Sequence, residues 1–378
     1  MDAVLAKGAD TKQTPQRQVP TIPFTHAAHE QMEMVSNVAN AVAAGAVKIP
    51  PIDVPARGYV RSQWIRSKGS AGNKGPAAVH EDFPFCVLDS LAFFDVGGGE
   101  IYNPLSGYET FLVNKYGGYA YMGDPTQHPD YDDDEIAWNF ALRIPFEISA
   151  ADALGCLSNQ NTQSKYKLNL TQADKGSIYT TDPTGQPTNT LDIYSELWSQ
   201  PPKATDKGAG IAFQPPLVGT TQYWTRETKD LSAGTHSVEI SRRGNQVRNF
   251  ILIWRETASG LRADATFPDP VRFVWDSREQ FEELSQYRRQ VMYERYGVAR
   301  GALDRGVYVY DFAHDVLGHP GGMDDGHLWL RTKSSSRLEF RGTFGAAGTL
   351  TILINDVAPV AVTDQYSEGS VTGGATVA

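Results

Sequence analysis

The fold is decided by residues 83–102, which read FPFCVLDSLAFFDVGGGEIY. An apolar, aromatic-rich run of strand length precedes three consecutive glycines, and Ile101 and Tyr102 follow them. Because glycine accepts a positive φ without a steric penalty, Gly97 to Gly99 predict a tight hairpin. This stretch therefore indicates two antiparallel strands in a β-rich fold.

Similar strand-like sequence patterns occur on both sides of this hairpin. Short, turn-bounded runs predict further strands at 58–67, 108–114, 136–146, 165–171, 191–197, 221–230, 250–256, 271–275, 307–312, 327–332, 337–344 and 349–355. The 35 glycines and 22 prolines among 378 residues leave little room for long helices. The sequence predicts an all-β fold with these core positions: Phe85, Val87, Leu91, Phe140, Leu142, Ile144, Phe250, Leu252, Val307, Val309, Leu350 and Ile352.

The best domain boundary is Pro201-Pro202, which is followed by an apolar-poor segment. We expect an N-terminal arm and helix over 1–55, a first barrel over 56–200, and a second barrel with a C-terminal tail over 201–378, each barrel closing its own sheets. One inserted helix is predicted in each half, at 149–157 and at 277–296, where Ser277 and Gln280 form a capping box. A weak internal repeat pairs residues 164–168 with 336–340 as equivalent strands, although chance explains such similarity as well.

The N-terminal region predicts an arm and a docking helix. Residues 1–24 lack an apolar period, whereas residues 26–46 follow Thr25 as a suitable N-cap. Apolar residues recur there at spacings of four and three, and this interface stripe consists of Ala28, Met32, Val35, Ala39, Val42 and Ala46. A stripe this thin is predicted to dock on its own barrel, on a neighbouring subunit or on lipid. The barrels are expected to fold without residues 1–46.

The charge balance indicates which kinds of partner the protein can bind. With 34 basic and 44 acidic residues the formal net charge is −10, which argues against a protein whose surface grips nucleic acid. One basic stretch stands out, made of Arg57, Arg61, Arg66, Lys68 and Lys74 with Tyr59 and Trp64 between them. Such a stretch suits a nucleic-acid surface, but the net acidity favours a strand edge or a subunit contact.

Cysteine content and hydropathy indicate a cytoplasmic origin. Cys86 and Cys156 are too few for a disulfide framework and are predicted to be reduced core thiols. No run approaches the roughly 20 apolar residues of a spanning helix, and the first 20 residues lack a signal-peptide core. We expect a soluble protein made in a reducing cytoplasm.

No residue pattern predicts catalysis or metal binding. His26, His29 and Glu30 stand in the order His-x-x-His-Glu, which is not the His-Glu-x-x-His order of zinc enzymes. Glycine-rich text typical of a solvated loop surrounds His314, His319, His327, Asp311, Asp315, Asp324 and Asp325. The acidic run 130–135 lacks the ligand spacing of a calcium loop, and no nucleophile elbow occurs. We expect no enzymatic activity, no metal and no cofactor.

The order of the segments resembles that of a known family. The first half carries IYNPLSGY at 101–108, NKYGG at 114–118, FALRIPFE at 140–147 and YKLNL at 166–170, and the second half carries YRRQ at 287–290 and GVYVYD at 306–311. From about residue 25 to 357 this order resembles the double jelly-roll major capsid proteins of tailless, internal-membrane icosahedral dsDNA phages, the tectivirus type. The resemblance implies two jelly-roll β-barrels side by side in each chain.

The resemblance also implies a function and partners. It implies a structural virion protein that forms a homotrimer of hexagonal outline and contacts neighbouring capsomers, vertex or penton proteins and minor capsid proteins. Contact of the arm with the viral membrane is left open, and direct nucleic-acid binding is not expected. One alternative is a minor vertex or spike protein of the same virion. Another is a carbohydrate-binding or carbohydrate-cleaving β-sandwich protein that stacks sugars on Trp64, Trp138, Trp198, Trp224, Trp254, Trp275 and Trp329.

Overall fold

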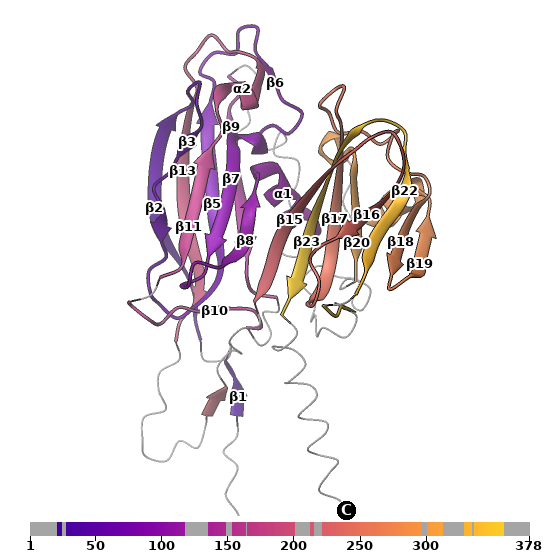
Figure 1. Cartoon of the computed structure of the whole chain (residues 1–378). Coiled ribbons are helices and arrows are strands. Elements are labelled where there is room, and N and C mark those ends of the chain that lie inside the picture. The colour runs from indigo at the N-terminus through magenta and orange to yellow at the C-terminus, as the bar shows by residue number, and fades with distance from the viewer. Residues whose placement is uncertain are drawn as a thin grey trace, which may run out of the picture.

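The computed structural model describes residues 21–24, 28–117, 135–148, 153–163, 165–200, 212–214, 221–296, 301–312, 329–334 and 336–358. Most of these residues belong to strands, which form two β-sandwiches side by side (Figure 1). The all-β fold class is confirmed.

The first sandwich contains β2 (Glu30–Ala41), β3 (Val47–Lys48), β4 (Ile52–Asp53), β5 (Tyr59–Ser70), β7 (Leu88–Phe94), β8 (Glu100–Leu105), β9 (Trp138–Pro145), β11 (Lys167–Gln172) and β13 (Thr188–Trp198). One sheet has the order β2-β13-β5-β9, and the facing sheet has β11 between β7 and the short strands β3 and β4, with β8 beyond β7. Short pairs complete the set: β6 (Ala78–Val79) with β12 (Tyr179–Thr181), β10 (Leu157–Ser158) with β5, and β1 (Thr21–Pro23) with β14 (Ala212–Gln214).

The second sandwich repeats this arrangement. It contains β15 (Gln222–Leu231), β16 (Gly234–Ile240), β17 (Gln246–Glu256), β18 (Val271–Trp275), β19 (Arg278–Glu283), β20 (Val307–Asp311), β21 (Leu330–Arg331), β22 (Leu338–Phe344) and β23 (Gly348–Val357). Its sheets have the orders β15-β23-β17-β20 and β16-β22-β18-β19. We number the main strands of each sandwich in chain order, count β3 and β4 as one position and leave out the short accessory strands. In both sandwiches the two sheets then have the strand orders 1-8-3-6 and 2-7-4-5, which is the jelly-roll topology. The two segments of the weak repeat, 164–168 and 336–340, lead into β11 and β22. Each of these is the seventh strand of its jelly roll.

An inserted helix follows the fifth strand in each jelly roll: α1 (Gly107–Tyr116) in the first and α3 (Ser285–Tyr296) in the second. Residues 108–114, predicted as a strand, are therefore helical, because Ser106 and Glu109 form a capping box at the start of α1. The predicted helix at 277–296 begins only at Ser285, since residues 278–283 form β19.

The helix predicted at 149–157 is wrong where the structure describes it. Residues 153–156 form a turn that leads into β10, and residues 149–152 lie outside the described residues. A further short helix, α2 (Lys175–Ile178), begins at the cap Asp174. Both inserted helices that the structure describes therefore occupy the same place in the jelly-roll topology.

The largest correction concerns the predicted docking helix, because residues 30–41 form β2, the first strand of the first jelly roll. It pairs antiparallel with β13 from Ala41↔Thr188 to Glu30↔Trp198. The six predicted docking residues share no face: Ala28 and Val42 are buried, Val35 is half-buried, and Met32, Ala39 and Ala46 are exposed.

A β-bulge explains the misleading period. The register shifts where Ser36 faces Ile193 and Met34 faces Tyr194, so Val35 is an extra residue in β2. The inward face of the strand therefore changes phase, and Val35, Val38 and Val42 contact the core at spacings of three and four residues. Those are the spacings of an amphipathic helix.

The two barrels are not separate sheets as expected. β8 and β15 pair in parallel through Tyr102 and Trp224, so one ten-stranded sheet crosses the predicted boundary. Residues 30–53, assigned to the arm, supply β2, β3 and β4 of the first jelly roll.

Every predicted core position listed above is buried, with Leu142 among the fully buried ones. We expect Leu142→Ala to lower the free energy of unfolding by about 2–5 kcal/mol, because the substitution leaves a cavity in packed surroundings. Chemical denaturation measures the change. Leu261→Ala, at a leucine that is 41% exposed, is the control and should change stability far less. Equal losses in the two variants would contradict the assignment of Leu142 to the core.

Candidate functional site: the junction between the barrels

In the sheet β15-β23-β17-β20, the strands β23, β17 and β20 are buried on both faces. Phe250, Leu252 and Trp254 pack inside the second barrel. The alternate residues pack into the hydrophobic core of the first barrel: Trp224, Ile251, Ile253, Val307, Val309 and Leu353. Two unbroken apolar runs in the sequence, FILIW at 250–254 and VYVY at 307–310, carried the signal of a sheet without a solvent face. Sequence reasoning missed this signal.

Helix α1 fills the first-barrel side of the junction. Its Tyr108, Phe111 and Leu112 are buried, and the Tyr108 hydroxyl donates to the carbonyl of Leu303 at 2.6 Å. At the other end of the helix the Lys115 Nζ lies 2.7 Å from an Asp304 carboxylate oxygen, with both side chains almost fully buried. The Tyr116 hydroxyl donates to the same carboxylate at 2.8 Å. The helix is thus fastened to the second barrel at both ends.

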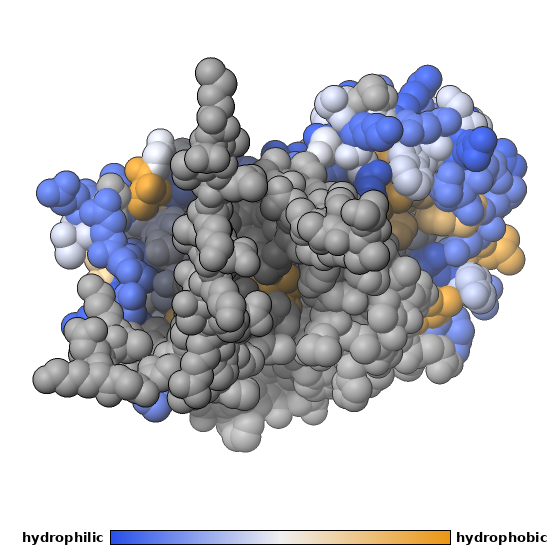
Figure 2. Space-filling view, turned by 90° about the horizontal axis from the view of Figure 1, so that it is seen from below, coloured by the Kyte–Doolittle hydropathy of each residue, from blue (hydrophilic) through white to orange (hydrophobic). Residues whose placement is uncertain are grey.

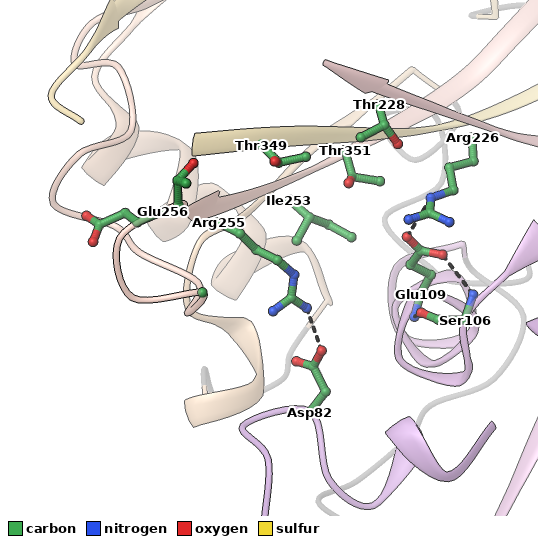
Figure 3. A pocket seen from close by; sticks show the side chains of 12 residues that line it. Asp82, Ser106, Glu109, Arg226, Thr228, Ile253, Arg255, Glu256, Thr349 and Thr351 are labelled. Atoms are coloured by element: carbon green, nitrogen blue, oxygen red, sulfur yellow. Dashed lines mark hydrogen bonds and ion pairs between the residues drawn. The ribbon is translucent and has the colours of Figure 1, made fainter. Parts of the chain in front are cut away.

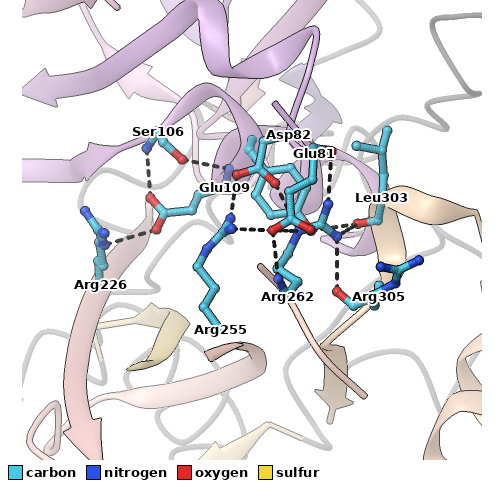
Figure 4. A network of polar contacts seen from close by, with 10 residues as sticks. Glu81, Asp82, Ser106, Glu109, Arg226, Arg255, Arg262, Leu303 and Arg305 are labelled. Atoms are coloured by element: carbon cyan, nitrogen blue, oxygen red, sulfur yellow. Dashed lines mark hydrogen bonds and ion pairs between the residues drawn. The ribbon is translucent and has the colours of Figure 1, made fainter. Parts of the chain in front are cut away.

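Two arginines of the second barrel clasp an acidic pair of the first (Figure 4). The Arg255 guanidinium contacts Glu81 at 2.7 Å and Asp82 at 2.5 Å. The Arg262 Nε lies 3.0 Å from Asp82, and the Arg262 side chain is only 1% exposed. Arg262 also donates to the carbonyls of Leu303 at 2.7 Å and Arg305 at 3.1 Å, and its guanidinium lies 4.5 Å from the centre of the Tyr108 ring.

A further ion pair joins the start of α1 to β15. One Glu109 oxygen accepts the Ser106 N–H at 2.8 Å as part of the capping box, and the other lies 3.0 Å from the Arg226 Nε. Burial raises the pKa of Glu109, while Arg226 and the Ser106 N–H oppose that shift. Glu109 thus satisfies the helix terminus and holds the second barrel at the same time.

A polar cavity of about 430 Å³ remains at this junction (Figure 3). The lining includes the threonines Thr228, Thr349 and Thr351 and the charged residues Asp82, Glu109, Arg226 and Arg255. The carboxylates of Asp82 and Glu109 are already engaged by arginines, and the Ser106 hydroxyl accepts the N–H of Glu109. No histidine or cysteine lines the cavity. The ion pairs around the cavity bind the barrels together.

The basic stretch does not form the strand edge that was expected. β5 lies between β13 and β9, so it is an interior strand. Arg61 is buried and contacts Glu30 at 2.7 Å, Glu147 at 2.6 Å and Glu196 at 3.1 Å. Arg66 contacts Asp192 at 3.3 Å, and Arg57 contacts Glu33 at 3.3 Å. Three of these five basic residues, Arg57, Arg61 and Arg66, thus pair with carboxylates within the first barrel.

The other residues weighed from the sequence do not form a site. His29 is exposed, whereas His26, His314, His319, His327 and residues 130–134 lie outside the described residues. Within the described ranges no three His, Cys, Asp or Glu side chains gather closely enough to hold a metal. Cys86 and Cys156 are free thiols, and burial raises the pKa of both. No helix among the described residues has the length and hydropathy needed to cross a membrane.

No family model and no curated protein sequence matches this chain. Solved structures do match. The STIV MCP superimposes with a TM-score of 0.60 at 12% identity, covering 89% of this chain and 98% of its own. The major capsid protein from Bacteriophage PM2 gives 0.55 at 10% identity, covering 87% and 98%, and a chain of the PBCV-1 virus capsid gives 0.55 at 10%, covering 87% and 94%. The double jelly-roll fold predicted from the sequence is thus confirmed.

Proposed function

We propose that this chain is a major capsid protein that assembles as pseudo-hexagonal trimers into the icosahedral shell of a tailless, internal-membrane dsDNA bacteriophage. The observation that carries the proposal is the fold itself, since capsid proteins share it over at least 87% of this chain, including that of Bacteriophage PM2. The junction supports it as well. Buried ion pairs hold the two barrels as one body, which suits a building block better than a catalyst.

The same reasoning proposes partners and a location. Three chains with two barrels each give six barrels, which matches a hexagonal outline. Neighbouring capsomers, vertex or penton proteins and minor capsid proteins would contact the flanks and ends of such a trimer, in the virion capsid and, during assembly, in the host cytoplasm. The net charge of −10 argues against direct nucleic-acid contact. The N-terminal residues before β2 would face a neighbouring subunit or the viral membrane.

The domain division forms part of the proposal in an amended form. The first jelly roll would begin with β2, and the second would begin with β15, so that the boundary falls within residues 199–221. The rival carbohydrate-binding function has little support, because Trp138, Trp224, Trp254 and Trp329 are buried and offer no stacking surface.

Light scattering on the purified chain tests the proposal. We expect a particle of about three times 41.4 kDa, with a hexagonal outline in electron micrographs. A chain that stays monomeric at micromolar concentration and binds a glycan array would contradict it.

A further inference from the structure

One end of the second barrel is formed by three chain connections. Residues 241–245 join β16 to β17, residues 276–277 join β18 to β19, and a third connection joins β21 to β22. The register places them at the same end, because β17, β21 and β23 meet at Gln246 in one sheet, and β16, β18 and β22 meet at Leu338 in the other. Seen from below, hydrophilic residues prevail on the visible part of the second barrel, on the right (Figure 2).

Six basic side chains stand on or beside these connections: Arg242, Arg243, Arg278, Arg331, Lys333 and Arg337. Three of them pair with carboxylates of the same barrel, in the pairs Arg242–Asp356 at 3.0 Å, Arg243–Glu239 at 3.1 Å and Arg337–Glu339. The other three are exposed and make no ion pair with any described residue. We call these three, Arg278, Arg331 and Lys333, the basic end. It presents unneutralised positive charge on a chain whose net charge is −10.

Hydrogen bonds between the connections hold the basic end in a fixed shape. The Thr332 hydroxyl donates to the carbonyl of Asn245 at 2.6 Å, which joins the third connection to the first. The exposed Asp276 carboxylate accepts the Arg337 N–H at 2.8 Å, which joins the second connection to the third. A surface that is already ordered loses little conformational entropy when a partner binds.

The first barrel adds an apolar side chain at the same end of the molecule. Because β8 and β15 run parallel and pair near their starts, the turn at 95–99 before β8 lies at the end where β15 begins. Val96 in this turn is 52% exposed. Exposed cations together with an apolar turn suit the surface of a bilayer, where cations meet lipid phosphates and an apolar side chain enters the headgroup region.

Nucleic acid is the other polyanion that exposed cations can bind. A single strand is held by aromatic side chains on which its bases stack. Among the aromatic side chains that the structure describes only Tyr287 is exposed, and it lies on α3, beyond the far end of β19. The described surface around the basic end therefore fits lipid headgroups better than bases.

We propose that the basic end binds the anionic phospholipid headgroups of a bilayer, with Arg278, Arg331 and Lys333 facing the lipid phosphates. This inference rests on the proposed function, and it places a lipid contact on the second barrel itself, apart from the residues before β2. β1 lies below the barrels at the same end (Figure 1), so the basic end and the N-terminal segment would face the same side of a shell.

Vesicle co-sedimentation with the full chain tests the proposal. We expect binding to vesicles made of equal parts phosphatidylglycerol and phosphatidylcholine, and none to phosphatidylcholine alone. Arg331→Glu and Lys333→Glu each change the local charge by two units, so each is expected to weaken binding about 25-fold, at about fivefold per unit of charge. Near-ultraviolet circular dichroism should show both variants folded, since the replaced side chains are exposed.

Lys48→Glu is the matched control. It changes the net charge by the same amount, but Lys48 is exposed on β3, which pairs with the opposite end of β11 from the turn at 95–99. Since salt screens charges beyond about 10 Å, the control should bind the same vesicles within about twofold of the unchanged chain.

Three results would overturn the proposal: no binding of the unchanged chain to anionic vesicles, equal binding by the Lys333→Glu and Lys48→Glu chains, or displacement of the vesicles by a short DNA duplex. The last result would assign the cations to nucleic acid. Trimer formation is measured by light scattering without vesicles, so each of these results leaves the proposed function standing.

Discussion

Replacing Arg262 by alanine is expected to lower the free energy of unfolding by about 3–5 kcal/mol, the cost of breaking a buried ion pair from one side. The guanidinium serves Asp82 and the carbonyls of Leu303 and Arg305. Without it each of these buried acceptors loses one donor, although Arg255 still contacts Asp82 and the Tyr108 hydroxyl still donates to Leu303. Chemical denaturation followed by tryptophan fluorescence measures the loss. Because Asp82 belongs to the first barrel and Arg262 to the second, we also expect the single unfolding transition to separate into two.

The matched control is Arg272→Ala, which removes an exposed arginine from ion pairs with Glu279 and Glu282. Exposed pairs of this kind contribute little, since water and salt screen them. Arg262→Lys provides a second comparison, because it keeps the charge but loses the planar fork that reaches two carbonyls and a carboxylate at once. If Arg262→Ala cost no more than Arg272→Ala, the clasp between the barrels would be an incidental contact.

Much of the fold could be predicted because its signal is local. The glycine hairpin at 97–99 and the strands on either side of it lie within one short stretch, and Gly98 adopts the positive φ that the turn requires. The predicted core positions are all buried, since apolar runs between turn residues identify strands without knowledge of their partners.

The errors have separate physical causes. The sequence of β2 has a helix-like period because a β-bulge at Val35 shifts the alternation of inward-facing and outward-facing side chains. α1 imitated a strand because it is buried on nearly all sides and lacks a polar stripe, although its capping box at Ser106 and Glu109 was legible in the sequence. A period is informative only where one face of an element meets water.

The junction could be predicted only in part. The unbroken apolar runs at 250–254 and 307–310 were sufficient to predict its apolar face. Its ion pairs were not, because Asp82 and Arg262 lie 180 positions apart in the chain and no spacing rule relates them. Such contacts depend on the tertiary fold, which a search for local patterns does not contain.

Deleting residues 1–41 is expected to prevent the first barrel from folding, which reverses the expectation drawn from the sequence. The deletion removes β2, so β13 loses one of its two neighbouring strands over the whole of its length. It also removes Val35 and Val38 from the hydrophobic core. The free energy of unfolding of a domain is only about 5–15 kcal/mol. We expect the loss of one jelly-roll strand with its core side chains to cost a similar amount. The expected product is insoluble or, in circular dichroism, lacks cooperative melting.

A chain that lacks only residues 1–20 separates the strand from the segment before it. This shorter deletion leaves β2 and every described contact of the barrels in place, so its unfolding transition should match that of the full chain. Under the proposed function its trimers should still form, and any defect should emerge only when shells assemble. If the chain without residues 1–41 melted like the full chain, β2 would be an appendage on the edge of β13 and not the first strand of the jelly roll.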